Sequence, residues 1–243
     1  MLIQGTSISV TYKKIEGIKK AYYNNEEILK NYFNEATVLP VPDDAPVEIP
    51  RIIIKTLHEH AQLNISPVAA TFEIHYNAGF EKNWELCAQY IAERMEKVFE
   101  FLNILTNNQY EYIGVVSNLI YDEITNNGAK KLSETLLNSK EIKNIYDVSI
   151  RYTFVEKSSI FVNIMLQNAR MFKEGLVLDQ AGALSLCNQT AETIGAIVDI
   201  NDRYDFNNNP DHRSSSSKLE LLLSSMSNII NDKLHTLIEM GEY

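Results

Sequence analysis

Apolar and polar residues alternate along several stretches of the chain, and this period of two predicts half-buried strands. The clearest example is residues 68–77, in which Phe72 and Ile74 alternate with polar neighbours. Similar patterns or short apolar runs predict the remaining strands, at residues 2–12, 51–60, 62–66, 109–122, 147–156, 160–172 and 193–200. The short turn "EKSS" predicts a hairpin between the strands at 147–156 and 160–172.

Other stretches repeat their apolar residues every three or four positions, which is the period of an amphipathic helix. Two of these helices are long, at 81–105 and at about 215–240. The serines at 214–217 precede the second long helix, and their hydroxyls are suited to capping its first turn. Shorter helices are predicted at 26–36 and 128–140. Between the elements, residues 39–50 carry four of the six prolines, and residues 173–190 match no regular pattern.

The order of these elements predicts an α+β domain. A largely antiparallel sheet would be covered by the two long amphipathic helices, and the hairpin connections exclude repeated βαβ units. We expect residues 1–243 to form a single domain. Because strands followed by one long helix occur twice, the alternative is a pair of pseudo-repeat halves, at 1–106 and 107–243.

The composition sets the class of protein and the compartment. Of 243 residues, 45% are hydrophobic and 22% are charged, as in ordinary globular domains. The net charge of −10 and the lack of a basic run argue against binding to DNA or RNA, which requires Lys and Arg at the phosphates. The chain shows no signal peptide and no apolar run near the roughly 18 residues of a membrane span. We therefore expect a cytoplasmic protein that binds neither nucleic acid nor a membrane.

Sequence motifs for cofactors and for nucleophilic catalysis do not occur. The chain has no GxGxxG, no GxxxxGK[ST] and no GxSxG, so we expect no cofactor and find no support for an enzyme. Cys87 and Cys187 lie far apart among apolar residues, which predicts buried free thiols and not a redox pair or a metal site.

The acidic stretch "IVDINDRYDFNNNPDH", residues 197–212, resembles a cation-binding loop in composition. An EF-hand loop requires glycine at its sixth position. Counted from Asp199 or from Asp205, that position holds Tyr204 or Pro210. A surface loop is therefore the favoured interpretation, ahead of an opportunistic cation site and of a pair of catalytic carboxylates.

Two further sets of residues suggest chemistry. His58 and His60 would share one face of a strand, and with His75 on a neighbouring strand they could bind a metal. A solvated strand end is the favoured alternative. Arg151 lies on the polar side of its strand and could pair with Asp199 across the sheet. Such a pair stabilises little if it is exposed.

The order of features resembles that of a sporadically distributed family of bacterial proteins of similar length whose activity is not known. The corresponding residues are "LNIS", "NWELCAQYI", "YIGVVSNLIY", "IVDINDRYDF" and "LHTLIE". A motif of that family reads like "RIGLRYIN". Ile113 and Gly114 match it, whereas Tyr112 and Val116 stand where the motif has arginines. The resemblance implies no catalytic residue, and the scattered occurrence of the family suggests a role in a phage-defence or mobile-element locus.

Three functions remain open on these grounds. The favoured hypothesis is a non-enzymatic interaction or regulatory protein that binds a protein partner or forms a homodimer. The second is a small-molecule binder with a cavity lined by Tyr110, Tyr112, Tyr121 and Tyr152. The third is a metal-dependent hydrolase that uses His58, His60 and an acidic residue.

Overall fold

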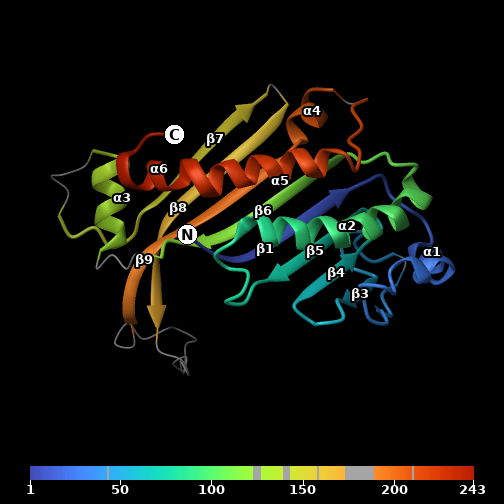
Figure 1. Ribbon diagram of the computed structural model, residues 1–243. Helices are drawn as coiled ribbons and strands as arrows, with labels where there is room; N and C mark the ends of the chain where they lie inside the picture. Colours follow the sequence, from blue (N-terminus) through green and yellow to red (C-terminus); the bar gives the residue numbers. More distant parts are fainter. Residues whose placement is uncertain (43, 123–126, 139–142, 158, 173–188, 210) are drawn as a thin grey trace.

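A computed structural model describes the chain except for residues 43, 123–126, 139–142, 158, 173–188 and 210. The described residues form one nine-stranded sheet with helices lying against it (Figure 1). The strands are β1 (Leu2–Thr11), β2 (Thr37–Val38), β3 (Ile52–Lys55), β4 (Ala61–Ile65), β5 (Ala69–His75), β6 (Tyr112–Ile120), β7 (Ser149–Glu156), β8 (Ile160–Phe172) and β9 (Gln189–Asn201).

The helices are α1 (Ile18–Asn25), α2 (Trp84–Thr106), α3 (Gly128–Leu136), α4 (Arg203–Asn208), α5 (Lys218–Asn228) and α6 (Leu234–Met240). A π-helical turn, Ile229–Lys233, joins α5 to α6. In Figure 1, α2, α5 and α6 lie in front of the sheet. None of the helices within the described ranges is long and apolar enough to cross a membrane.

The sheet is antiparallel throughout, and its strand order is β2-β3-β4-β5-β1-β6-β9-β8-β7. β1 and β6 pair at its centre, with Ser7 opposite Val116. Because side chains alternate along a strand, Ile8 and Val10 are fully buried while Ser7 and Ser9 lie on the other face. The prediction of an α+β fold with a largely antiparallel sheet is confirmed.

The helices bury their apolar stripes in the same core as the sheet. Ile91 and Leu102 of α2 are fully buried, as are Leu222 of α5 and Ile238 of α6. The side chain of Asn83 caps α2 by accepting a hydrogen bond from the N–H of Leu86 at 3.0 Å. In α2, α5 and α6, the apolar residues that recur at helical spacing therefore form the buried face.

The helix predicted at 26–36 is wrong. The structure places α1 earlier, directly after Gly17, whose φ of 66° is accessible to glycine at little cost. Residues 26–28 form only a 3-10 turn. Leu29 and Phe33 are both buried, but Phe33 is held in a bridge to Thr56 at the sheet edge, which an α-helix does not allow.

The proline-rich segment at 39–50 is organised by a buried arginine. Arg51 is only 2% exposed, and its guanidinium donates hydrogen bonds to the backbone carbonyls of Pro42, Ala45, Pro46 and Ile49. These carbonyls replace the water that the guanidinium loses on burial. The segment is therefore fixed against β3 by a polar contact that pattern analysis does not reveal.

Candidate functional site

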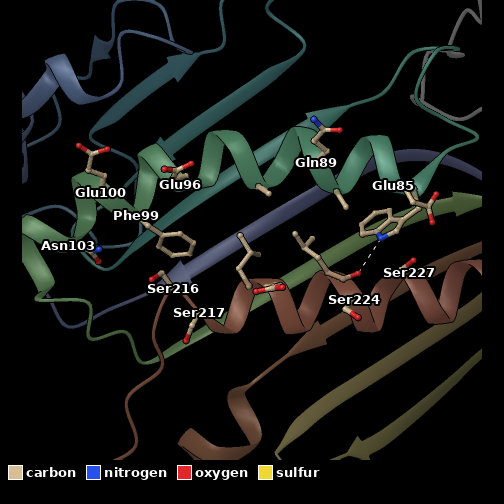
Figure 2. A pocket seen from close by; sticks show the side chains of 16 residues that line it. Glu85, Gln89, Glu96, Phe99, Glu100, Asn103, Ser216, Ser217, Ser224 and Ser227 are labelled. Carbon is tan, nitrogen blue, oxygen red and sulfur yellow. Dashed lines mark hydrogen bonds between the residues drawn. The ribbon is translucent and has the colours of Figure 1, made fainter.

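A groove lies between α2 and α5 (Figure 2). Its volume is about 880 Å³. The residues from α2 are Trp84, Glu85, Ala88, Gln89, Ala92, Glu96, Phe99, Glu100 and Asn103. Those from α5 and the segment before it are Ser216, Ser217, Leu219, Glu220, Leu223, Ser224 and Ser227.

The two helices run in opposite directions along the groove. At one end, the Trp84 Nε1–H donates a hydrogen bond to the carbonyl of Leu223 at 3.2 Å. Beside it, Asn231 Nδ2 donates to Glu85 Oε1 at 2.9 Å. At the opposite end, the side chain of Asn108 accepts from the N–H of Ser216 at 3.0 Å. These polar contacts hold α2 and α5 at a fixed separation, so the groove is a property of the fold.

The inside of the groove is apolar. Trp84, Phe99, Leu219 and Leu223 are all buried, with at most 7% of each residue exposed. They recur at helical spacing on the sides of α2 and α5 that face one another. An apolar inside lined by largely buried residues is suited to a ligand that also has an apolar face.

Small residues keep the groove open. Ala88 and Ala92 lie one turn apart on α2, and Ser217, Ser224 and Ser227 lie on the facing side of α5. Larger side chains at these positions would project into the space between the helices. Small residues also allow a third backbone to approach two helices closely.

The rim of the groove is acidic. Glu85, Glu96 and Glu100 lie on α2 and Glu220 lies on α5, whereas no Lys or Arg belongs to the lining. Lys97, which lies outside the groove, forms an ion pair with Glu100, with 2.6 Å between Lys97 Nζ and Glu100 Oε2. Glu96 and Glu220 form no ion pair with any residue that the structure describes. The groove therefore favours a ligand that carries positive charge at its edges.

The three candidate metal ligands do not form a site. The strand predicted at 51–60 ends at Lys55, and the following residues turn back into β4. His58 and His60 therefore lie in a hairpin turn and not on one strand face. The N–H of His75 donates to the carbonyl of His60 at 3.1 Å, so these two are cross-strand neighbours, but all three imidazoles are exposed. Within the described ranges, no three His, Cys, Asp or Glu residues are grouped as metal ligands.

Arg151 and Asp199 are not in direct contact, because β8 lies between β7 and β9. Asn163 of β8 connects them. Its Oδ1 accepts from Arg151 at 3.2 Å, and its Nδ2 donates to Asp199 Oδ2 at 3.1 Å. In place of the predicted ion pair, the side-chain amide of Asn163 therefore bridges the two charged groups. Asp199 Oδ1 also accepts a hydrogen bond from Asn201 Nδ2 at 2.8 Å.

The acidic stretch at 197–212 is only partly the surface loop that we expected. Residues 203–208 form α4, and Asp202 before it is completely buried. Its carboxylate accepts from the N–H of Ile113 at 2.7 Å and from the hydroxyl of Ser214, and the Nε2 of His212 lies 4.0 Å away. No local signal marks Asp202, because Ile113 is 89 residues away in the chain.

The cysteine prediction is confirmed for Cys87, which is a buried free thiol. Its Sγ–H donates to the carbonyl of Phe80 at 3.4 Å, and burial raises the pKa of the thiol to about 11. Cys87 therefore stays protonated and unreactive near neutral pH. Cys187 and residues 173–188 lie outside the described residues.

The four tyrosines expected to line a cavity do not line the groove. Tyr110 and Tyr121 are buried and satisfy their hydroxyls inside the protein, by donating to Asn103 at 2.6 Å and to Glu239 respectively. Tyr112 packs against Phe206, with ring centroids 5.7 Å apart, and Tyr152 stacks on Phe154. These side chains therefore contribute to packing, and Tyr110 also borders a separate, smaller pocket of about 350 Å³.

Glu239 of α6 joins three elements. It accepts hydrogen bonds from Lys131 of α3 and from Tyr121, and these bonds lower the pKa of its carboxyl. A lowered folded-state pKa means that the charged form stabilises the fold above the ordinary carboxyl pKa. That contribution is lost as the pH falls through the lowered value.

We expect Glu239→Gln to reduce the free energy of unfolding by about 1 kcal/mol at neutral pH, because the pair is partly buried. The difference from the parent protein should shrink as the pH falls below the ordinary range of a carboxyl. Urea unfolding at several pH values measures this. Glu134→Gln, on the exposed side of α3, serves as a control and should change little. A difference that is constant with pH would contradict the assignment.

Comparison with models of known protein families finds no match, and a search of characterised proteins finds no similar sequence.

Proposed function

We propose that this chain is a non-enzymatic interaction protein that binds an amphipathic, basic helix of a partner protein in the groove between α2 and α5. One observation carries the proposal: an apolar groove of about 880 Å³ between two helices has four glutamates and no Lys or Arg in its lining. A helix laid into a hydrophobic groove is a recurring mode of protein recognition.

The dimensions of the groove suit a helix. Its lining extends along α2 from Trp84 to Asn103, which at 1.5 Å per residue is about 29 Å. A ligand helix of about 18 to 20 residues has nearly the same length. Ala88 and Ala92 would allow its apolar side chains to reach Trp84 and Phe99.

Charge sets the orientation and the class of partner. Glutamates on both helices flank the apolar floor, so Lys and Arg on the two flanks of a bound helix would find opposite charges. Such rim contacts mainly increase the association rate and the specificity. They also predict that binding weakens as salt is added.

We further propose that residues 1–106 and 107–243 are pseudo-repeat halves, each contributing one long helix that covers the sheet. Two observations support this. β1 pairs with β5, and β6 pairs with β9. In each half, the first strand therefore pairs with the last strand of the antiparallel meander that follows it. α2 follows the first meander, and the helical run Lys218–Met240 follows the second. The groove is then the space between two equivalent helices.

A small-molecule function is less well supported. The groove is long and open along one side, with Gln89, Ser217 and Glu220 on its borders, whereas small ligands are usually enclosed on most of their surface. The lining also contains no His, Cys or Lys, so its serine hydroxyls have no imidazole or amine beside them to activate them as nucleophiles.

The proposal is testable through Trp84, which is the single tryptophan of the chain and lies in the groove. The ligand is a synthetic, tryptophan-free helix of about 18 residues with leucine and alanine on one face and Lys and Arg on its flanks. We expect saturable changes in Trp84 fluorescence that weaken with salt. A peptide with Glu in place of Lys and Arg should bind at least about tenfold more weakly.

Ala92→Arg and Leu86→Arg form a matched pair of variants. Both positions are exposed on α2, but only Ala92 lines the groove. We expect Ala92→Arg to weaken peptide binding by at least about tenfold, because its side chain fills the groove and repels a basic helix. Leu86→Arg should bind like the parent protein. Equal loss in the two variants, or equal binding of both peptides, would refute the groove as the binding site.

A further inference from the structure

β7 is an edge strand of the sheet. It ends the strand order of the sheet and pairs with β8 along its whole length, from Ser149 opposite Gln167 to Glu156 opposite Ile160. No strand in the part of the chain that the structure describes pairs with its outer edge. In Figure 1, β7 forms the upper border of the sheet behind α6.

The register shows which backbone groups face outward. The N–H of Asn168 donates to the carbonyl of Val148 at 3.3 Å, so the polar groups of Val148 face β8. In an antiparallel pair, hydrogen-bonded and non-bonded positions alternate. The backbone N–H and C=O groups of the even-numbered residues of β7 therefore form hydrogen bonds with β8. The residues whose N–H and C=O face outward are Ser149, Arg151, Thr153 and Val155.

This edge lacks several of the features that usually prevent pairing, although Arg151 and Glu156 on it are charged. β7, with the sequence "SIRYTFVE", contains no proline or lysine, and its register with β8 has no bulge. Natural edge strands are commonly blunted by such features. β-branched and aromatic residues make up most of the strand and favour extended pairing.

Exposed apolar side chains surround the same edge. Val155 is 46% exposed on the strand, and Tyr146, three residues before the strand, is 57% exposed. Tyr243 is 39% exposed and stacks on Phe154 with ring centroids 4.2 Å apart. Because side chains alternate along a strand, apolar groups are therefore available on both faces of the sheet beside the unpaired edge.

We propose that β7 pairs antiparallel with β7 of a second copy of this chain, which joins the two sheets into one continuous sheet across a two-fold axis. This goes beyond the proposed binding of a helix and uses a different surface. The opposite edge strand, β2, has only two residues, so pairing through β7 closes a dimer and does not propagate a fibre.

The chemistry of β7 fits a second copy. In one register that pairs the outward-facing residues with each other, Tyr152 lies opposite the partner's Tyr152, and residues 149–155 of the two strands overlap. Arg151 then lies opposite the partner's Thr153, and Ile150 lies opposite the partner's Phe154. Aromatic and β-branched pairs of this kind stabilise neighbouring strands, and no like charges face each other.

Thr153→Pro and Thr153→Val separate backbone pairing from the side chain. Both remove the hydroxyl that donates to Asn163 at 2.8 Å, but only proline removes the outward N–H. Native mass spectrometry of the full chain at about 10 µM should give twice 27.7 kDa for the parent protein and for Thr153→Val. Thr153→Pro should give 27.7 kDa. Since the groove lies elsewhere, Ala92→Arg should remain dimeric.

Hydrogen exchange of the parent protein tests the pairing without any variant. In a dimer the outward amides of Arg151, Thr153 and Val155 are protected, as are the amides of Tyr152 and Phe154 that bond to β8. In a monomer the three outward amides exchange rapidly. A monomeric parent protein would overturn the proposal. So would a dimer that persists in Thr153→Pro, or rapid exchange of the three outward amides in the dimer.

Discussion

Replacing Asp202 with alanine is expected to lower the free energy of unfolding by about 3 kcal/mol. The carboxylate is completely buried and accepts hydrogen bonds from Ile113 and Ser214. Alanine leaves both donors buried without an acceptor, and each such donor costs about 1 to 3 kcal/mol. Because the contacts join the end of β9 to β6 and to the segment before α5, the whole domain should be destabilised.

Urea unfolding followed by circular dichroism measures this effect. Asp199→Ala is the matched control, since Asp199 lies three residues earlier, on β9, but is only partly buried and bonds to Asn163 and Asn201. It should change stability by about 0.5 kcal/mol. Asp202→Asn should fall between the two, because its amide oxygen can still accept one hydrogen bond. An Asp202→Ala protein as stable as Asp199→Ala would show that the buried carboxylate does not join these segments.

Replacing Trp84 with alanine is expected to lower the free energy of unfolding by about 3 to 5 kcal/mol. Trp84 is 2% exposed at the first turn of α2, and its indole contacts α5. The loss combines a cavity at the junction of the two helices with the broken hydrogen bond to Leu223. Unfolding should be followed by circular dichroism, because the variant has no tryptophan.

Trp84→Phe separates the two contributions. Phenylalanine keeps an aromatic ring but cannot donate to the carbonyl of Leu223, so we expect a smaller loss, of about 1 to 2 kcal/mol. Leu86→Ala is the control, since Leu86 lies on the same turn of α2 and is 44% exposed. Its loss should stay within about 0.5 kcal/mol. If Trp84→Ala were no more destabilising than Leu86→Ala, α2 and α5 would not be held together at this point.

Local periodicity was sufficient for most of the secondary structure. Alternation of apolar and polar residues located strands such as β5 and β8, and the three-to-four-residue repeat located α2 and the run from Lys218 to Met240. Local patterns failed where two segments were equally apolar. Ile18 and Tyr22 have the same spacing as Leu29 and Phe33, but only the first pair is helical, whereas Phe33 forms a bridge with Thr56.

The candidate sites depended on contacts between distant parts of the chain. Arg151 and Asp199 could be placed on the polar sides of their strands from the sequence, but the strand order put Asn163 between them. His58 and His60 were separated from a common face by a turn that begins after Lys55. The alternation of apolar and polar residues specifies the face of the sheet on which a side chain lies. It does not specify which strand lies beside it in the sheet.

The sequence by itself determined the α+β class, the amphipathic faces of α2, α5 and α6 and the acidic character of the chain, because each of these is a local or a summed property. Only the tertiary structure decided that Ala88 and Ala92 of α2 would face the serines of α5 across a groove. It also decided that β7 would be an edge and that Asp202 would be buried. These features arise from packing between residues far apart in the chain, which no local pattern encodes.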